Sequence, residues 1–108
     1  MNDTREVDLS PFYVAEVQLA DYVLRLREPL VLTPELDDSR QLMCVAYPSL
    51  GVDVCAFTRD DLDEALVVEF DVLWRNYAKA DDGELSPASR ELKRGLLARM
   101  EEVARAER

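Results

Sequence analysis

Four acidic side chains crowd into residues 60–64, and they are the groups in this sequence best suited to chemistry. Carboxylates so close together could hold a divalent metal ion. Asp60, Asp61, Asp63 and Glu64 follow a strong helix-start signal, however, and neighbouring residues on a helix project in different directions. Acidic first turns are also favoured by the helix dipole alone. No second group of ligands accompanies them in the sequence, so we predict no metal site and no cofactor.

The chain lacks the side chains on which much catalysis depends. It contains no histidine, which is the commonest general base and the usual partner of a nucleophilic serine or cysteine. Its three glycines, at positions 51, 83 and 95, do not form a phosphate-binding loop. We therefore predict that the protein is not an enzyme.

A β-hairpin is predicted just before the acidic cluster. If Pro48 to Gly51 form a four-residue loop, the flanking strands pair so that one face is entirely apolar, as a sheet packed on a helix requires. The predicted pairs on that face are Tyr47 with Val52, Val45 with Val54, and Met43 with Ala56.

The opposite face of this hairpin carries both cysteines of the chain. The same register places Cys44 opposite Cys55 and Ala46 opposite Asp53. Cysteines that oppose each other on neighbouring strands could reach bonding distance, but in a reducing cytoplasm we expect two small, half-buried residues instead. Two cysteines without a histidine also make a poor zinc site.

An amphipathic helix is predicted to begin after Thr58, which is a good N-cap, and to continue to about Tyr77. Glu69 falls inside its apolar stripe, so its carboxylate must lie at the edge of the stripe or meet a cation. Trp74 lies at the other margin, as a core-boundary residue or a contact for a partner. The stripe that should cover the sheet consists of Leu62, Ala65, Leu66, Phe70, Leu73 and Tyr77.

The flanking segments complete the predicted organisation. Residues 1–10 are polar and are predicted to be disordered. A strand is predicted from Phe12 to Leu19, with a helix as the alternative, and another from Tyr22 to Leu32, which Pro29 confines to a sheet edge or divides in two. Residues 81–108 are predicted to form a turn and an amphipathic helix. The apolar seam of that helix covers its own domain or a second subunit, as a homodimer would, and it consists of Leu92, Leu96, Met100 and Val103.

The composition fits one globular domain. The chain has 108 residues, and its 23 acidic and 13 basic side chains give a net charge of −10, which repels phosphate backbones. We therefore expect no direct nucleic-acid binding. With no apolar run long enough to span a bilayer and no secretory signal, we expect a cytoplasmic protein. The predicted fold class is α+β, with a small, mostly antiparallel sheet of three to four strands in residues 11–80, one main helix packed on it, and a C-terminal helix.

The hairpin and its helix resemble the HicB-like antitoxin family. The residues that carry the likeness are Ala46-Tyr47-Pro48-Ser49-Leu50-Gly51, then a second strand, then Thr58 followed by Asp61-Leu62-Asp63-Glu64-Ala65-Leu66. The resemblance implies a partial double-stranded-RNA-binding-like α+β fold that binds and inhibits a small toxin ribonuclease. Operator binding is not carried over, because residues 86–108 offer a single helix where the family often has a DNA-binding motif.

We therefore expect a non-enzymatic protein-binding module whose acidic surface occludes a small basic partner. The candidate contact residues are Asp53, Asp60, Asp61, Asp63 and Glu64, with Trp74 as a candidate anchor. Two alternatives remain open: an acidic mimic of nucleic acid that blocks a DNA-binding protein, and a homo-oligomeric accessory or structural subunit.

Overall fold

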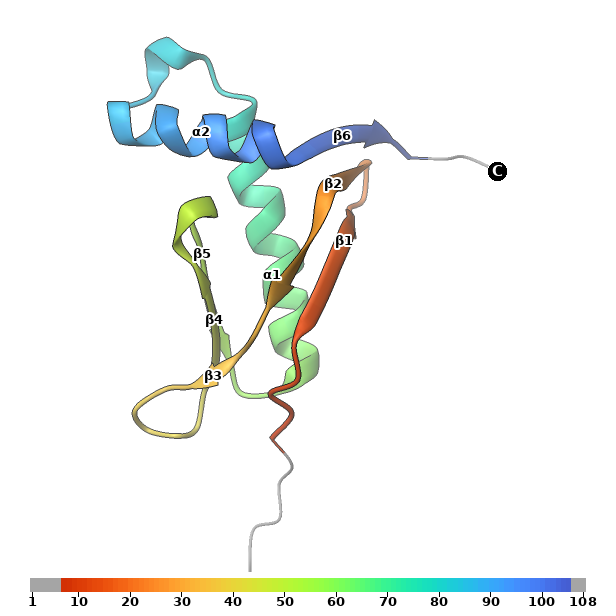
Figure 1. Ribbon diagram of the computed structural model, residues 1–108, viewed down its shortest axis with the longest axis vertical. Coiled ribbons are helices and arrows are strands. Elements are labelled where there is room, and N and C mark those ends of the chain that lie inside the picture. The colour runs from red at the N-terminus through yellow and green to blue at the C-terminus, as the bar shows by residue number, and fades with distance from the viewer. Residues whose placement is uncertain (1–6, 106–108) are drawn as a thin grey trace, which may run out of the picture.

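The computed structural model describes residues 7–105, which form two three-stranded antiparallel sheets and two α-helices (Figure 1). Sheet A has the strand order β1-β2-β6, and sheet B has the order β3-β4-β5. The elements are β1 (Phe12–Gln18), β2 (Tyr22–Leu32), β3 (Glu35–Leu36), β4 (Met43–Tyr47), β5 (Val52–Ala56), α1 (Arg59–Leu73), α2 (Pro87–Arg99) and β6 (Met100–Ala104). The α+β class is confirmed, but two sheets replace the single sheet that the sequence predicted.

Some predictions fall partly outside this range. Residues 1–6 of the predicted disordered N-terminus and residues 106–108 of the predicted C-terminal helix are not among the described residues. Residues 7–11 precede the first strand and belong to no helix or strand. No helix within residues 7–105 is long and apolar enough to cross a membrane.

The β4–β5 hairpin forms in the predicted register. Met43 pairs with Ala56, Val45 with Val54, and Tyr47 with Val52. The loop is a short 3₁₀ turn, Pro48–Leu50, closed by Gly51 at a φ of 75°. Glycine adopts this left-handed conformation without strain, and a Cβ at this position would lie 3.2 Å from the Leu73 side chain. The turn therefore sits close against the end of α1.

Pro29 lies where the ladder of sheet A is interrupted, but β2 remains one strand of 11 residues and does not divide in two. Residues 30–32 of β2 pair with the start of β1 and residues 23–25 pair with its end, with a register shift between Val14 and Glu16. On the other side, β6 pairs only with residues 22–26 of β2. Pro29 therefore lies where β2 has no ladder partner, and its missing N–H breaks no bond. The first half of β2 is nonetheless the central strand of sheet A, not an edge.

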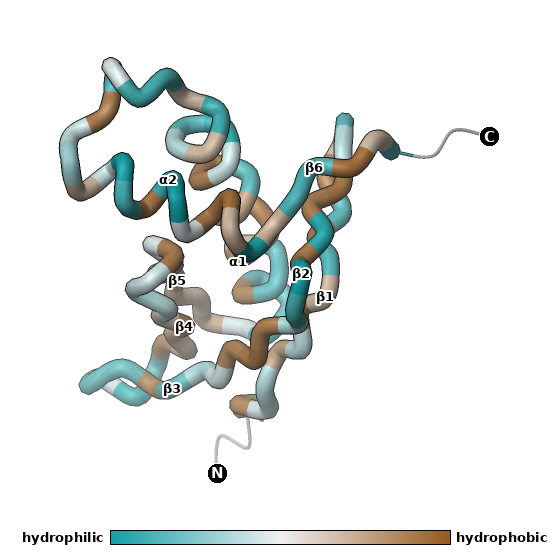
Figure 2. The backbone as a smooth tube through the Cα atoms, turned by 45° about the horizontal axis from the view of Figure 1, so that its top comes forward, coloured by the Kyte–Doolittle hydropathy of each residue, from teal (hydrophilic) through white to brown (hydrophobic). Residues whose placement is uncertain are grey.

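Helix α1 supplies the core that joins the two sheets. It lies behind both of them, with β4 and β5 to one side and β1 and β2 to the other (Figure 1). Leu62, Leu66, Phe70 and Leu73 of the predicted stripe are buried, and they belong to one cluster with the apolar faces of β2, β4 and β5. Hydrophobic and hydrophilic positions alternate in the middle of β2, as expected for a strand with one buried face (Figure 2). Helical structure continues past α1 as a π-helical segment, Trp74–Ala78.

The C-terminal segment differs from the prediction. Ser86 caps α2 by accepting a hydrogen bond from the Ser89 N–H at 3.2 Å, as the sequence suggested, but the helix ends at Arg99. Residues 100–104 then form β6, which pairs antiparallel with β2, with Met100 opposite Leu26. The open edge of β2 provides backbone partners that outweigh the helical spacing of the sequence, so tertiary pairing overrides local propensity here.

The seam proposed for a homodimer packs within its own chain. Leu96 is fully buried, Met100 is 1% exposed, and both belong to the common core. Leu92 packs against that core, and Val103 lies in β6 opposite Val23. Leu96 and Met100 are therefore not available to a second subunit in this structure, whereas Leu92 and Val103 are half-buried.

The expectation of unpaired cysteines is wrong for this structure. Cys44 and Cys55 are joined by a disulfide, with Cα atoms 4.0 Å apart. Directly opposed residues come this close at the non-hydrogen-bonded positions of an antiparallel ladder. The predicted register thus brings the two sulfur atoms together, whereas the contrary expectation rested on an assumed reducing compartment.

Candidate protein-binding surface

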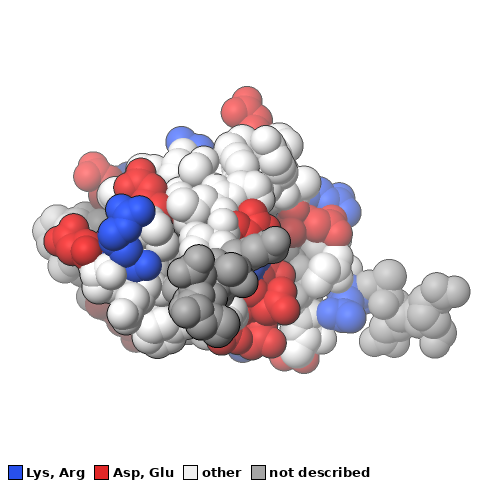
Figure 3. Space-filling view, turned by 90° about the horizontal axis from the view of Figure 1, so that it is seen from below, with Lys and Arg blue, Asp and Glu red and all other residues white. Residues whose placement is uncertain are grey.

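The acidic residues at the start of α1 are all exposed and leave the helix in different directions. Thr58 caps the helix, because its hydroxyl oxygen accepts a hydrogen bond from the Asp61 N–H at 3.1 Å. Asp61 and Glu64 border a groove shared with β5, whereas Asp63 borders a separate cleft shared with β1. Figure 3, which views the molecule from the end at which α1 begins, shows acidic side chains spread over much of that face. The cluster therefore gives α1 two acidic flanks, not one ligand set.

The first flank is a shallow groove of about 440 Å³ between β5 and α1, called here the acidic groove. Its apolar wall contains Val54, Ala65 and Val68, and Val68 is 60% exposed. Three carboxylates and no basic side chain accompany them among the lining residues, namely Asp61, Glu64 and Glu69. One turn farther along the helix, Val72 is 43% exposed and extends the apolar ridge. A partner that fits this surface must offer both apolar contacts and positive charge.

Glu69 closes part of the free edge of β5. Its carboxylate accepts a hydrogen bond from the backbone N–H of Asp53 at 3.2 Å. Asp53 lies two residues before Cys55, so it also occupies a non-hydrogen-bonded position of the ladder between β4 and β5. Its N–H therefore points away from β4 and toward α1. The sequence placed Glu69 at the edge of the stripe or against a cation, and the structure gives it a backbone partner at the edge. Asp53 itself keeps an exposed side chain.

Trp74 does not lie on this surface. It is 4% exposed and belongs to the core, so it cannot anchor a partner in this structure. Its indole N–H donates a hydrogen bond to Oε1 of Glu102 at 2.8 Å, and Lys79 Nζ lies 3.2 Å from the same oxygen. Sequence reasoning could not find this pair because it did not predict the strand that carries Glu102.

A second, part-buried contact lies beside the first. The hydroxyl of Tyr22 donates to Oδ1 of Asp71 at 2.7 Å, and Nε of Arg75 donates to the same oxygen at 2.6 Å. Burial and the nearby Asp71 carboxylate raise the pKa of Tyr22, whereas the Tyr22 hydrogen bond lowers the pKa of Asp71. The Trp74 hydrogen bond, followed by Lys79, lowers the pKa of Glu102. Each group faces a partner within the chain, so we interpret this network as structural.

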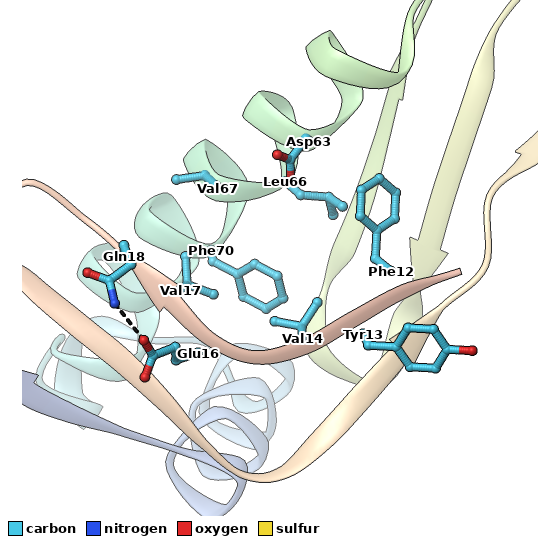
Figure 4. A pocket seen from close by; sticks show the side chains of 10 residues that line it. All are labelled: Phe12, Tyr13, Val14, Glu16, Val17, Gln18, Asp63, Leu66, Val67 and Phe70. Atoms are coloured by element: carbon cyan, nitrogen blue, oxygen red, sulfur yellow. Dashed lines mark hydrogen bonds between the residues drawn. The ribbon is translucent and has the colours of Figure 1, made fainter. Parts of the chain in front are cut away.

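The second flank is a cleft of about 310 Å³ between β1 and α1, called here the β1 cleft (Figure 4). Phe12, Val14 and Val17 point from β1 toward the side chains of α1, whereas Tyr13 points away. The helix contributes Leu66, Val67 and Phe70 to the opposite wall. Glu16, Gln18 and Asp63 stand at its polar margin, and Gln18 Nε2 donates to Glu16 Oε2 at 2.6 Å.

The sequence did not predict either hollow, because both depend on how far α1 stands from the two sheets. Val68 and Val72, spaced by one helical turn outside the predicted stripe, were the one signal available for the acidic groove. Within residues 7–105, no group of three or more cysteine or acidic side chains has the arrangement of a metal site.

Comparison with models of protein families, with curated proteins and with solved structures finds no match for this chain. The HicB-like resemblance therefore stays a prediction.

Proposed function

We propose that the chain is a non-enzymatic protein-binding module that holds a small basic partner against the acidic groove. The observation that carries the proposal is the exposed Val68 side chain among the carboxylates of Asp61, Glu64 and Glu69. Exposed apolar side chains ringed by charge of one sign are typical of recognition surfaces.

The more specific form of this proposal is a HicB-like antitoxin that occludes a small basic toxin ribonuclease. It is supported by the resemblance of the hairpin and helix start, and by a net charge of −10. Negative charge on α1 would speed encounter with a basic protein, and burial of Val54 and Val68 would lengthen the life of the complex. Occlusion of this kind requires no chemical step from the inhibitor.

The test is capture of a partner on the immobilised chain at low and high salt, followed by a comparison of two charge-matched double variants. Asp61→Asn/Glu64→Gln removes two carboxylates from the acidic groove. Asp38→Asn/Glu91→Gln removes two exposed carboxylates elsewhere, in the β3–β4 loop and on α2. We expect one small basic protein, retained at near-equal amount and released by salt. We expect the groove variant to bind it about 10-fold more weakly and the control within about 2-fold of the wild type.

Three results would contradict the proposal. Equal weakening by both double variants would assign the binding to overall charge. Recovery of the bait alone, as two or more copies, would favour a self-assembling accessory subunit. Capture of a DNA-binding protein that DNA displaces would favour a nucleic-acid mimic.

A further inference from the structure

The free edge of β1 is the longest open strand edge beside an apolar cleft in the described part of the chain. Strand β5, the edge of sheet B next to α1, is partly closed by the Glu69 carboxylate. Strand β3 has only two residues, and β6 carries adjacent glutamates at positions 101 and 102. Strand β1 has seven residues, and the β1 cleft runs along it. An exposed edge of this kind is a template for pairing with another segment.

The hydrogen-bonding phase of β1 identifies which backbone groups are free. The N–H of Leu19 donates to the carbonyl of Tyr22 at 2.9 Å, so Leu19 faces β2. The backbone N–H and C=O groups of successive residues in an antiparallel strand point alternately to its two sides. The backbone groups of Val17, two residues before Leu19, therefore also point toward β2. Glu16 and Gln18 therefore direct their N–H and C=O groups toward the open edge. These are the groups to which an added strand would bond.

The β1 cleft provides a place for the side chains of such a strand. A fourth strand would lie about 4.8 Å from β1 and would direct alternate side chains toward α1. Those side chains would meet Val67 and Phe70 on the helix and would continue the layer formed by Val14 and Val17 (Figure 4). Small or β-branched apolar residues suit a hollow of about 310 Å³.

The charges around the cleft select the kind of segment. Glu16 and Asp63 stand at its margin, and none of its ten lining residues is basic, although the guanidinium of Arg59, which pairs with Asp8, lies 3.7 Å from the centre of the Phe12 ring at one end. The other side chains of an added strand would face the same side as Glu16, where lysine or arginine is favoured. Tyr13, which is 75% exposed and lies opposite the 53% exposed Val31, gives that face an apolar platform for the stem of a basic side chain.

We infer that the β1 edge binds an extended partner segment of alternating apolar and basic residues, which adds to sheet A as a fourth antiparallel or parallel strand. This inference rests on the proposed function in taking the partner to be basic, and it assigns part of the recognition to a second surface. The mode is strand addition, in which backbone bonds provide affinity and the cleft selects alternate side chains.

A proline at position 18 tests the edge without removing a ladder bond. The N–H of Gln18 faces outward, so Gln18→Pro blocks the added strand while the bonds of β1 to β2 persist. Gln18→Ala is the matched control, because both variants lose the side-chain bond to Glu16. The probe is a fluorescein-labelled peptide of alternating lysine and valine, about nine residues long, with a glutamate–valine peptide as its charge-reversed control.

We expect fluorescence anisotropy to show binding of the lysine–valine peptide to the wild type and, within about 2-fold, to Gln18→Ala. We expect Gln18→Pro to bind the lysine–valine peptide at least about 10-fold more weakly than the wild type does. We expect the wild type to bind the glutamate–valine peptide at least about 10-fold more weakly than the lysine–valine peptide. Amide exchange provides a measurement that needs no variant: saturating peptide should slow the exchange of the Glu16 and Gln18 N–H groups by about 10-fold or more.

Equal affinity of the two position-18 variants would overturn the inference. So would unchanged exchange at Glu16 and Gln18, or no binding of the lysine–valine peptide to the wild type. If Gln18→Pro does not fold, the exchange measurement on the wild type decides. A captured partner that depends on Asp61 and Glu64 but binds Gln18→Pro normally would leave the proposed function standing and exclude strand addition.

Discussion

Trp74 and Glu102 form a hydrogen bond that fastens the last strand to the helical layer. The indole N–H donates to Oε1 at 2.8 Å across 28 residues of sequence. Trp74 is 4% exposed, so water is not a ready substitute for the carboxylate. Because Glu102 pairs with Leu24 in sheet A, this bond connects the end of α1 to both β6 and β2.

Substitution Glu102→Ala should destabilise the protein by about 1–3 kcal/mol, because it leaves a buried N–H without an acceptor. Glu101→Ala is the control: its carboxylate meets Arg27 at 3.8 Å on the exposed side of β6, and it should cost less than about 1 kcal/mol. Urea unfolding followed by the fluorescence of Trp74, the single tryptophan, measures both free energies. Equal losses would show that Trp74 does not depend on this acceptor.

Lowering the pH should reduce the free energy of unfolding through two carboxyl groups in this same region. The pKa of Asp71 is lowered by the Tyr22 hydrogen bond, and the pKa of Glu102 by the Trp74 hydrogen bond. A carboxyl whose folded pKa lies below its unfolded value stabilises the fold above about pH 4, and this contribution is lost as the pH falls through the folded pKa. Asp71→Asn/Glu102→Gln keeps an acceptor oxygen at each site but removes the titration. Urea unfolding between neutral pH and about pH 3 should therefore show a smaller decline in unfolding free energy for the variant. A parallel decline in both proteins would contradict this assignment.

The hairpin and α1 could be predicted from the sequence because their signals are local. Alternation around Pro48 to Gly51 sets the register, and the Thr58 cap with its apolar stripe sets the helix. A four-residue loop leaves one register that buries the apolar face, so even the Cys44–Cys55 pairing follows from it. Whether the thiols join is a question of redox chemistry that the pattern does not contain.

Strand β6 could not be predicted, because its cause lies far away in the sequence. Residues 92–103 have helical spacing, and nothing local stops α2 at Arg99. The strand forms because residues 22–26 of β2 present an open edge. The hydrogen bond of Trp74, which the sequence placed at the margin of the stripe as a core-boundary residue or a contact, was missed for the same reason, since its acceptor Glu102 was assigned to a helix. The two flanks of α1 likewise depend on tertiary spacing, although Asp61, Asp63 and Glu64, which the sequence singled out, are exposed.

Gly51 should be far less replaceable than Gly83. At Gly51 the φ of 75° disfavours other residues, and a Cβ would lie 3.2 Å from Leu73 and 3.3 Å from Leu92. Gly51→Ala should therefore destabilise the protein by about 1–3 kcal/mol through backbone strain and displaced core side chains. Gly83 has nothing within 4 Å of such a Cβ, and Gly83→Ala should be neutral or slightly stabilising. Thermal unfolding of the two variants compares them directly, and similar transition temperatures would show that the turn can relax.

The disulfide between Cys44 and Cys55 should contribute measurably to stability. It closes a loop with a sequence separation of 11 residues, for which loss of freedom in the unfolded chain predicts about 3 kcal/mol. Denaturant unfolding of the wild type with and without a thiol reductant should reveal this difference. The double variant Cys44→Ser/Cys55→Ser should match the reduced protein and should not respond to reductant. Since β4 and β5 remain paired through the short Pro48–Leu50 turn, the reduced protein should still fold. If the oxidised wild type is no more stable than the double variant, the disulfide adds nothing to the order that the β4–β5 ladder already imposes on this loop.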